Sequence, residues 1–219
     1  PGSADKMGTV QFNDDGTKMF LTFHNGLNNT AAHRSDDKIN EYTLSVPYDI
    51  STATYAGNDE RCSVVDPDHS SSHQSTGATL GFKFADDGMK IFTMQRGLND
   101  RKTSFVNRLD LTTAYDISTC TYHSDVNVDT NARQNGTNIG DRSTDNNNNL
   151  QGMFITNDGK KMFLTMNDRD GPQSIKQYSL STPYDLSTLA LASSTAISLQ
   201  SHNPFGVTFG NNGKRLFVS

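Results

Sequence analysis

The sequence is poor in glutamate, in cysteine, in basic charge and in long apolar runs, and each shortage excludes a class of protein. Apolar residues make up only 33% of the 219 residues, which is too few for a helical bundle. No apolar stretch approaches the roughly 18 residues that span a bilayer, so we expect no membrane span. The formal net charge of −5 argues against nucleic acid as a partner, because phosphate binding needs clustered lysine and arginine.

The few cysteines and glutamates restrict the chemistry that the chain can perform. Cys62 and Cys120 are the only cysteines, and two cysteines give neither a disulfide framework nor the spacing of a metal site. Their number favours two unpaired thiols, with a single disulfide as the alternative. Glu41 and Glu60 are the only glutamates, which counts against an enzyme with a site of acids and histidines.

The strongest positive signal is an internal repeat. Four segments align without gaps on a glycine, each with an apolar residue four positions before it, a base two positions after it and phenylalanine four positions after it. The segments are 12–20, 84–92, 155–163 and 209–217, and their glycines are Gly16, Gly88, Gly159 and Gly213. The glycines are unequally spaced although the motif is constant, so we expect loops of variable length on a fixed scaffold.

A second motif follows in the first three units. Tyr-Thr-Leu at 42–44, Leu-Asp-Leu at 109–111 and Tyr-Ser-Leu at 178–180 lead into Pro-Tyr-Asp-Ile-Ser-Thr or a close variant at 47–52, 114–119 and 183–188. The tyrosine of this segment, Tyr48, Tyr115 or Tyr184, keeps a constant spacing from the element before it. We interpret the segment as a turn between two strands.

The two motifs divide each unit into four short strands. We predict second strands at 18–22, 90–94, 161–166 and 215–219, third strands at 38–44, 104–111 and 174–180, and fourth strands around 53–55, 121–122 and 190–192. The Asp-Gly or Asn-Gly pair supplies the positive φ of a tight hairpin turn, and no segment shows a helical apolar period. The fold class is therefore all-β.

Four antiparallel strands in each unit, repeated along the chain, predict the blades of a β-propeller. The phenylalanine after each glycine and the apolar residue before it are expected to pack between blades. Residues 1–219 then form one partial propeller, with repeats at 8–76, 77–148 and 149–203 and a truncated fourth at 204–219. Because propellers need about four to eight blades, we expect the chain to be part of a larger propeller. An open stack of the same units is the alternative.

The combined motif resembles a known group of repeats. Phe-x-x-Asp-Gly-x-Lys-Met-Phe followed by Tyr-Thr-Leu-Ser-x-Pro-Tyr-Asp-Ile-Ser-Thr is similar to the repeats of YVTN/lactonase-like β-propellers. The similarity is greatest to a poorly characterised subtype found in surface proteins of marine bacteria and in phage structural proteins. It implies a seven-bladed or similar propeller used for display, adhesion or receptor contact. The second unit departs from the pattern, with Leu-Asp-Leu at 109–111 and Ala114 in place of proline.

Most candidate chemical groups have a simpler structural interpretation. Asp49, Asp116 and Asp185 recur at equivalent positions, so we expect each to accept hydrogen bonds from the serine and threonine amides that follow it. The Asp-Gly hairpin turns lack the ligand pattern of a calcium loop. We expect no cofactor, and the acidic segment 168–171 is the better candidate for calcium.

The histidines do not form a recognisable site. His69 and His73 have the spacing that would bind one metal ion on a helix, but their polar surroundings predict a loop. No nucleophile-elbow motif supports a Ser-His-Asp triad.

The insertions at 23–37, 57–76, 95–103 and 124–149 are the predicted binding regions, because loops on rigid scaffolds carry binding. The first and third follow the second strands of adjacent blades and should emerge on one face. The candidate binding residues are His24, Asn25, Asn28, His33, Arg34, Arg96, Asn99 and Arg101. Spacers that face solvent or another subunit are the alternative.

The sequence therefore predicts a non-catalytic module for surface display, adhesion or receptor and protein binding, as a virion component (phage fibre or decoration) or an extracellular structural component. We expect a protein or glycan partner, or other copies of the chain, and an extracellular, cell-surface or virion-surface location. The alternatives are a lactonase-like hydrolase with a central-channel site and a structural filament subunit. Non-repeated Glu, His or Asp side chains that converge in the channel would favour the enzyme.

Overall fold

The computed structural model describes residues 5–25, 38–64, 79–96, 104–128, 133–134, 137–138, 149–167, 173–197 and 205–219. These residues are almost entirely β-structure and form successive antiparallel sheets. The first sheet contains β1 (Asp5–Phe12), β2 (Lys18–Asn25), β3 (Lys38–Leu44), β4 (Ala53–Tyr55) and β5 (Arg61–Ser63). The second contains β6 (Thr79–Ala85), β7 (Lys90–Arg96), β8 (Ser104–Asp110) and β9 (Thr121–Asn127).

The third sheet contains β12 (Asn149–Ile155), β13 (Lys161–Asn167), β14 (Ser174–Leu180) and β15 (Leu189–Ala196). The fourth contains β16 (Val207–Gly210) and β17 (Arg215–Val218), and β10 (Arg133–Gln134) pairs with β11 (Thr137–Asn138). Short 3-10 helices η2 (Ile50–Thr52), η3 (Ile117–Thr119) and η4 (Leu186–Thr188) precede the outermost strands.

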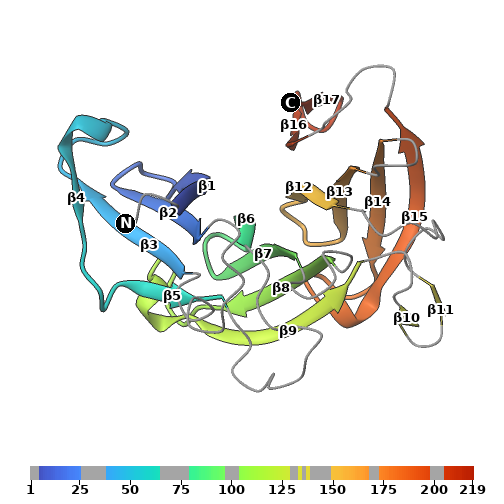
Figure 1. Ribbon diagram of the computed structural model, residues 1–219, viewed down its shortest axis with the longest axis horizontal. Coiled ribbons are helices and arrows are strands. Elements are labelled where there is room, and N and C mark those ends of the chain that lie inside the picture. The colour runs from blue at the N-terminus through green and yellow to red at the C-terminus, as the bar shows by residue number, and fades with distance from the viewer. Residues whose placement is uncertain are drawn as a thin grey trace.

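The sheets follow one another around an arc, as Figure 1 shows. The first strands, β1, β6, β12 and β16, lie nearest the centre of the arc and each contacts the next. The outermost strands, β4, β9 and β15, lie at the periphery. The structure is a β-propeller of four-stranded antiparallel blades rather than an open stack. Among the described residues, no helix has the length and apolarity needed to cross a membrane.

The predicted strands agree with the observed ones, most closely for the third strand of each blade. Several of the predicted second strands end too early, since β2 continues to Asn25 and β7 to Arg96. Two of the predicted fourth strands are also too short: β9 continues to Asn127, into the predicted insertion at 124–149, and β15 continues to Ala196. It missed β5, which continues the outer strand of the first blade after β4 and pairs with β3. The predicted turns contain the three 3-10 helices.

The two sequence motifs of each unit dock against each other. The turn glycine has a positive φ, and its carbonyl accepts a hydrogen bond from the tyrosine amide. The tyrosine ring covers the glycine so closely that a Cβ there would lie within 2.7 Å of ring carbons. The pairs are Gly16–Tyr48, Gly88–Tyr115 and Gly159–Tyr184. Glycine is therefore required at the turn both for its backbone conformation and for the space that the ring occupies.

The recurrent aspartates stabilise the following turn through the serine amide, as predicted, whereas the threonine amide donates to the main-chain carbonyl of the aspartate instead of its carboxylate. Asp116 Oδ1 accepts hydrogen bonds from the Ser118 amide at 3.2 Å and from the Ser118 hydroxyl at 2.6 Å. Asp49 and Asp185 make the same two bonds in their own blades and cap η2 and η4. The three carboxylates therefore serve as N-caps of the 3-10 helices.

The repeated phenylalanines pack between blades, which confirms their predicted role. Phe20 of the first blade lies 4.7 Å from Phe84 of the second, measured between ring centroids. Phe163 of the third blade lies 4.5 Å from Phe209 of the fourth. In each case the residue after one turn glycine contacts the residue before the next. Phe217, the equivalent residue in β17, is 53% exposed.

The prediction of unpaired thiols is wrong, because Cys62 and Cys120 form a disulfide with a Cα–Cα distance of 5.8 Å. Cys62 lies in β5 of the first blade, and Cys120 caps η3 of the second. The contact between β5 and η3 brings the two sulfurs together. Just beyond β5, the Val64 carbonyl accepts hydrogen bonds from the side-chain amides of Gln95 and Asn107 at 2.9 and 3.3 Å. The first two blades are thus linked covalently and by buried hydrogen bonds.

Candidate functional site

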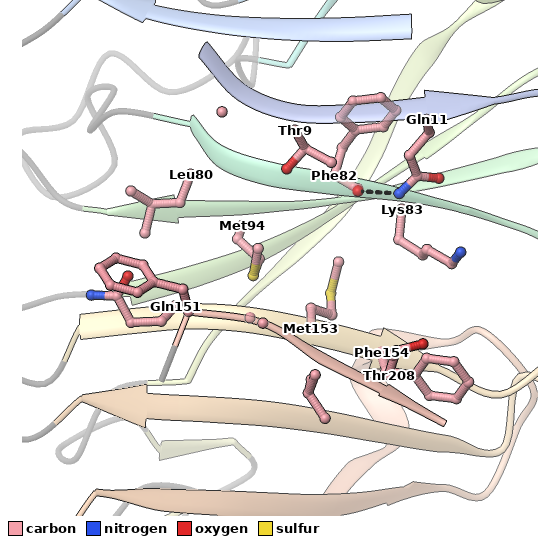
Figure 2. Close-up of a pocket in the computed structure, with 15 residues that line it drawn as sticks. Thr9, Gln11, Leu80, Phe82, Lys83, Met94, Gln151, Met153, Phe154 and Thr208 are labelled. Atoms are coloured by element: carbon pink, nitrogen blue, oxygen red, sulfur yellow. Dashed lines mark hydrogen bonds between the residues drawn. The ribbon is translucent and has the colours of Figure 1, made fainter. Parts of the chain in front are cut away.

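A cleft of about 450 Å³ lies between the inner strands of the four blades. Figure 2 shows Thr9 and Gln11 of β1 on one side of it and Phe154 and Thr208 of β12 and β16 on the other. Lys83 extends from β6 between these two sides. Because each inner strand belongs to a different blade, the rigid packing of the blades fixes the shape of the cleft.

Glycines allow the inner strands to approach one another beside the cleft. A Cβ on Gly81 would lie 2.5 Å from Thr9 Oγ1 in the neighbouring blade. A Cβ on Gly152 would lie 2.9 Å from the Cα of Gly206, also in the next blade. These glycines were not predicted as part of a site, although Gly81, Gly152 and Gly206 each stand seven positions before a turn glycine.

Gln11 joins the inner strands of the first two blades through its side chain. Its Nε2 donates a hydrogen bond to the Phe82 carbonyl at 2.6 Å, and its Oε1 accepts one from the Phe84 amide at 3.2 Å. Figure 2 shows the first of these bonds. The Gln11 side chain therefore bonds both a carbonyl and an amide of the β6 backbone and holds β1 against β6.

Lys83 faces the cleft because side chains alternate along β6. Its neighbours Phe82 and Phe84 are buried in the core between the first two blades, so the residue between them points to the opposite side. Burial lowers the pKa of the Lys83 ammonium below its usual 10.5. Within the described part of the chain, no hydrogen bond or ion pair involves this ammonium.

The remaining polar groups of the cleft are neutral. They are the amides of Gln11 and Gln151 and the hydroxyls of Thr9 and Thr208. No aspartate, glutamate, histidine or cysteine is among the described residues that line the cleft. The described lining therefore offers one cation and several neutral polar groups, and it includes no carboxylate or imidazole.

The buried glutamate of the chain lies elsewhere and has a structural role. Glu41 is buried in β3 and forms an ion pair with Lys18 at 2.9 Å. Burial raises the pKa of Glu41 despite this cation. Lys18 Nζ also donates to the Tyr115 carbonyl of the second blade at 3.2 Å, and Arg108 donates to the equivalent Tyr184 carbonyl at 3.1 Å. These cations therefore connect each blade to the turn of the next.

The predicted loop site lies largely outside the described residues. Asn28, His33, Arg34, Asn99 and Arg101 belong to undescribed segments, as do His69, His73 and the acidic segment 168–171.

The predicted site residues that are described lie at the ends of equivalent second strands. His24 and Asn25 end β2, opposite Lys6 and Asp5 of β1, and Arg96 ends β7 opposite Ser104 of β8. The common face predicted for the two loops stays a prediction. No group of three metal-ligating side chains occurs within the described segments.

No protein-family model and no curated protein matches the sequence. Solved structures do match. A candidate 6-phosphogluconolactonase from Bacteroides fragilis aligns with 100% of this chain and 49% of its own, with a TM-score of 0.57 and 13% identity. A candidate 6-phosphogluconolactonase from Bacteroides uniformis aligns with 98% of this chain and 47% of its own, with a TM-score of 0.55 and 13% identity. Hydrazine synthase from Kuenenia stuttgartiensis aligns with 95% of this chain and 48% of its own, with a TM-score of 0.55 and 11% identity.

The chain has a β-propeller fold like that of these solved structures. This agrees with the resemblance seen in the repeat motifs. The chain spans about half the length of these solved structures, because the alignments cover 47% to 49% of their residues. At such low identity the likeness concerns the fold and not the activity.

Proposed function

We propose that the chain is a non-catalytic recognition module that contacts a protein or glycan partner at an extracellular, cell or virion surface. The observation that carries the proposal is the described lining of the central cleft, which combines one unpaired cation with neutral amides, hydroxyls and aromatic rings. Hydrolases commonly use a carboxylate or an imidazole as the general base, and the described lining supplies neither.

Two further features support the proposed location and mode of action. The disulfide between Cys62 and Cys120 favours an oxidising compartment, where such bonds persist. The loops that differ between blades are attached to rigid sheets, an arrangement that suits partner recognition. The resemblance of the repeats to those of bacterial surface proteins and phage structural proteins points in the same direction.

The rival function is that of a lactonase-like hydrolase, which the fold of the two Bacteroides proteins favours. A turnover assay with glucono-δ-lactone and its 6-phosphate separates the two. We expect no hydrolysis above the uncatalysed rate at micromolar protein, and saturable hydrolysis would overturn the proposal.

Binding is tested independently with a glycan array and with labelled protein on intact cells. We expect saturable binding that weakens when His24 and Arg96 are both replaced by alanine, since these residues lead into the loops predicted to share one face. The matched control is Lys160→Ala, which removes an exposed cation at a hairpin turn. Absence of binding in both assays would contradict the proposal.

A further inference from the structure

We propose that the central cleft binds a carboxylate-bearing saccharide, with Lys83 as the partner of the carboxylate. The inference deepens the proposed recognition function and rests on the cleft being a binding site without catalysis.

Lys83 does not belong to the set of residues that build the blade. It stands five positions before the turn glycine, where the other blades have Gln11, Phe154 and Thr208. Gln11 clamps the neighbouring strand, but the Lys83 side chain makes no equivalent bond within the described segments. A residue that departs from the repeat and faces the shared cleft is a candidate for recognition rather than for packing.

The environment of Lys83 favours a bound anion. A partly desolvated ammonium without a partner destabilises the empty protein, and an anion in the cleft would compensate that cost. The lowered pKa of Lys83 has burial as its cause, which agrees with a cation that lacks a compensating charge. No carboxylate among the described lining residues competes for the ammonium.

The number of charges favours a carboxylate over a phosphate. Phosphate groups carry up to two negative charges and are bound by several cations or by clustered backbone amides. Lys83 is the only lysine or arginine among the described residues that line the cleft. A single cation matches a single negative charge, which is what a carboxylate carries at neutral pH.

The other groups of the cleft suit a sugar ring. Phe154 and the 63% exposed Phe205 offer apolar ring surfaces, whereas the side chains of Gln151 and Thr208 have no hydrogen-bond partner within the described residues. A pyranose presents apolar C–H faces and several hydroxyls and so matches both kinds of surface. The cleft volume of about 450 Å³ lies within the range of small-molecule pockets.

Isothermal titration with D-glucuronate, D-glucose and D-glucose 6-phosphate at pH 7 tests this inference. We expect glucuronate to bind with a dissociation constant of about 1 mM, as is usual for a ligand of this size, and glucose to bind about tenfold more weakly or worse. Lys83→Met should weaken glucuronate binding about tenfold or more, because it removes the charge and keeps an unbranched apolar stem. Lys160→Met, at an exposed position outside the cleft, should leave it unchanged.

Equal binding of glucose and glucuronate, tighter binding of the phosphate, or no binding of any of the three would overturn the inference. So would normal glucuronate binding by Lys83→Met. Lys83→Gln provides a second uncharged variant, and circular dichroism checks that each variant is folded. Lactone turnover would contradict the proposed function, whereas loss of carboxylate preference without turnover would contradict this inference alone.

Discussion

The contact between the turn glycine and the tyrosine ring makes a quantitative prediction for Gly88→Ala. Gly88 has a φ of +84°, and a Cβ there would lie 2.4 Å from a ring carbon of Tyr115. The left-handed conformation costs alanine about 1–2 kcal/mol, and pushing the ring aside adds about 1–3 kcal/mol of overpacking. The variant should therefore lose about 2–5 kcal/mol, or roughly 4–20 °C in Tm for a chain of this length.

The ring is held from several sides, so it cannot move without loss. The Tyr115 amide donates to the Gly88 carbonyl at 3.0 Å, and its hydroxyl donates to Asp14 of the first blade at 2.8 Å. Its ring centroid lies 5.0 Å from that of Phe84. Displacing the ring disturbs the contacts of the hydroxyl and of the ring, and with them the junction between the first two blades.

A double-mutant cycle separates the two contributions to this cost. In a Tyr115→Ala background the same glycine substitution should cost only the backbone share, about 1–2 kcal/mol. Gly213→Ala is a matched control, since Gly213 has a φ of +79° and nothing within 4 Å of its added Cβ. Urea unfolding followed by circular dichroism measures each free energy. An identical cost of Gly88→Ala with and without the Tyr115 ring would refute the proposed steric role of the glycine.

Three other predictions follow from contacts between and within the blades. Replacing Cys62 and Cys120 by serine should lower the free energy of unfolding by about 4 kcal/mol, because the bond closes a loop with a sequence separation of 58, and an unchanged urea midpoint would contradict this. Gln11→Glu should cost about 1–3 kcal/mol at pH 7, since a carboxylate oxygen would then face the Phe82 carbonyl, and the loss should shrink in acid, where the carboxyl group regains a donor. Burial lowers the pKa of Lys83 from 10.5, so between the lowered pKa and 10.5 the unfolded chain holds a proton that the folded chain has released. The free energy of unfolding should therefore rise with pH across this window. Lys83→Met should abolish this rise in urea titrations.

The blade architecture could be predicted because it depends on local chemistry repeated at fixed offsets. Turn glycines, strand alternation and the capping aspartates all act within a few residues of their own positions. The phenylalanines at constant spacing also revealed the packing between blades, since a sheet that repeats along the chain buries its faces against its neighbours. Repetition thus converted a contact between distant residues, such as Phe20 with Phe84, into a recognisable pattern.

Contacts made only once in the chain could not be predicted in this way. Cys62 and Cys120 lie in different blades, and their pairing depends on β5, an extra strand segment without a counterpart in the other units. The docking of Tyr115 on Gly88 does recur, but the two residues belong to motifs far apart in the sequence. Constant spacing within each motif carried no information about the distance between motifs.

The cleft was missed for a different reason, which also explains why it matters. Comparison of repeats highlights residues that stay constant, and these residues stabilise every blade in the same way. A shared central cleft is lined by the position that changes from blade to blade, as Gln11, Lys83, Phe154 and Thr208 show. Lys83 is the residue among them whose burial opposes folding, because its cation loses water without gaining a partner within the described residues. A variant without the charge should therefore be at least as stable as the parent while it loses the ligand, a combination that a purely structural lysine would not give.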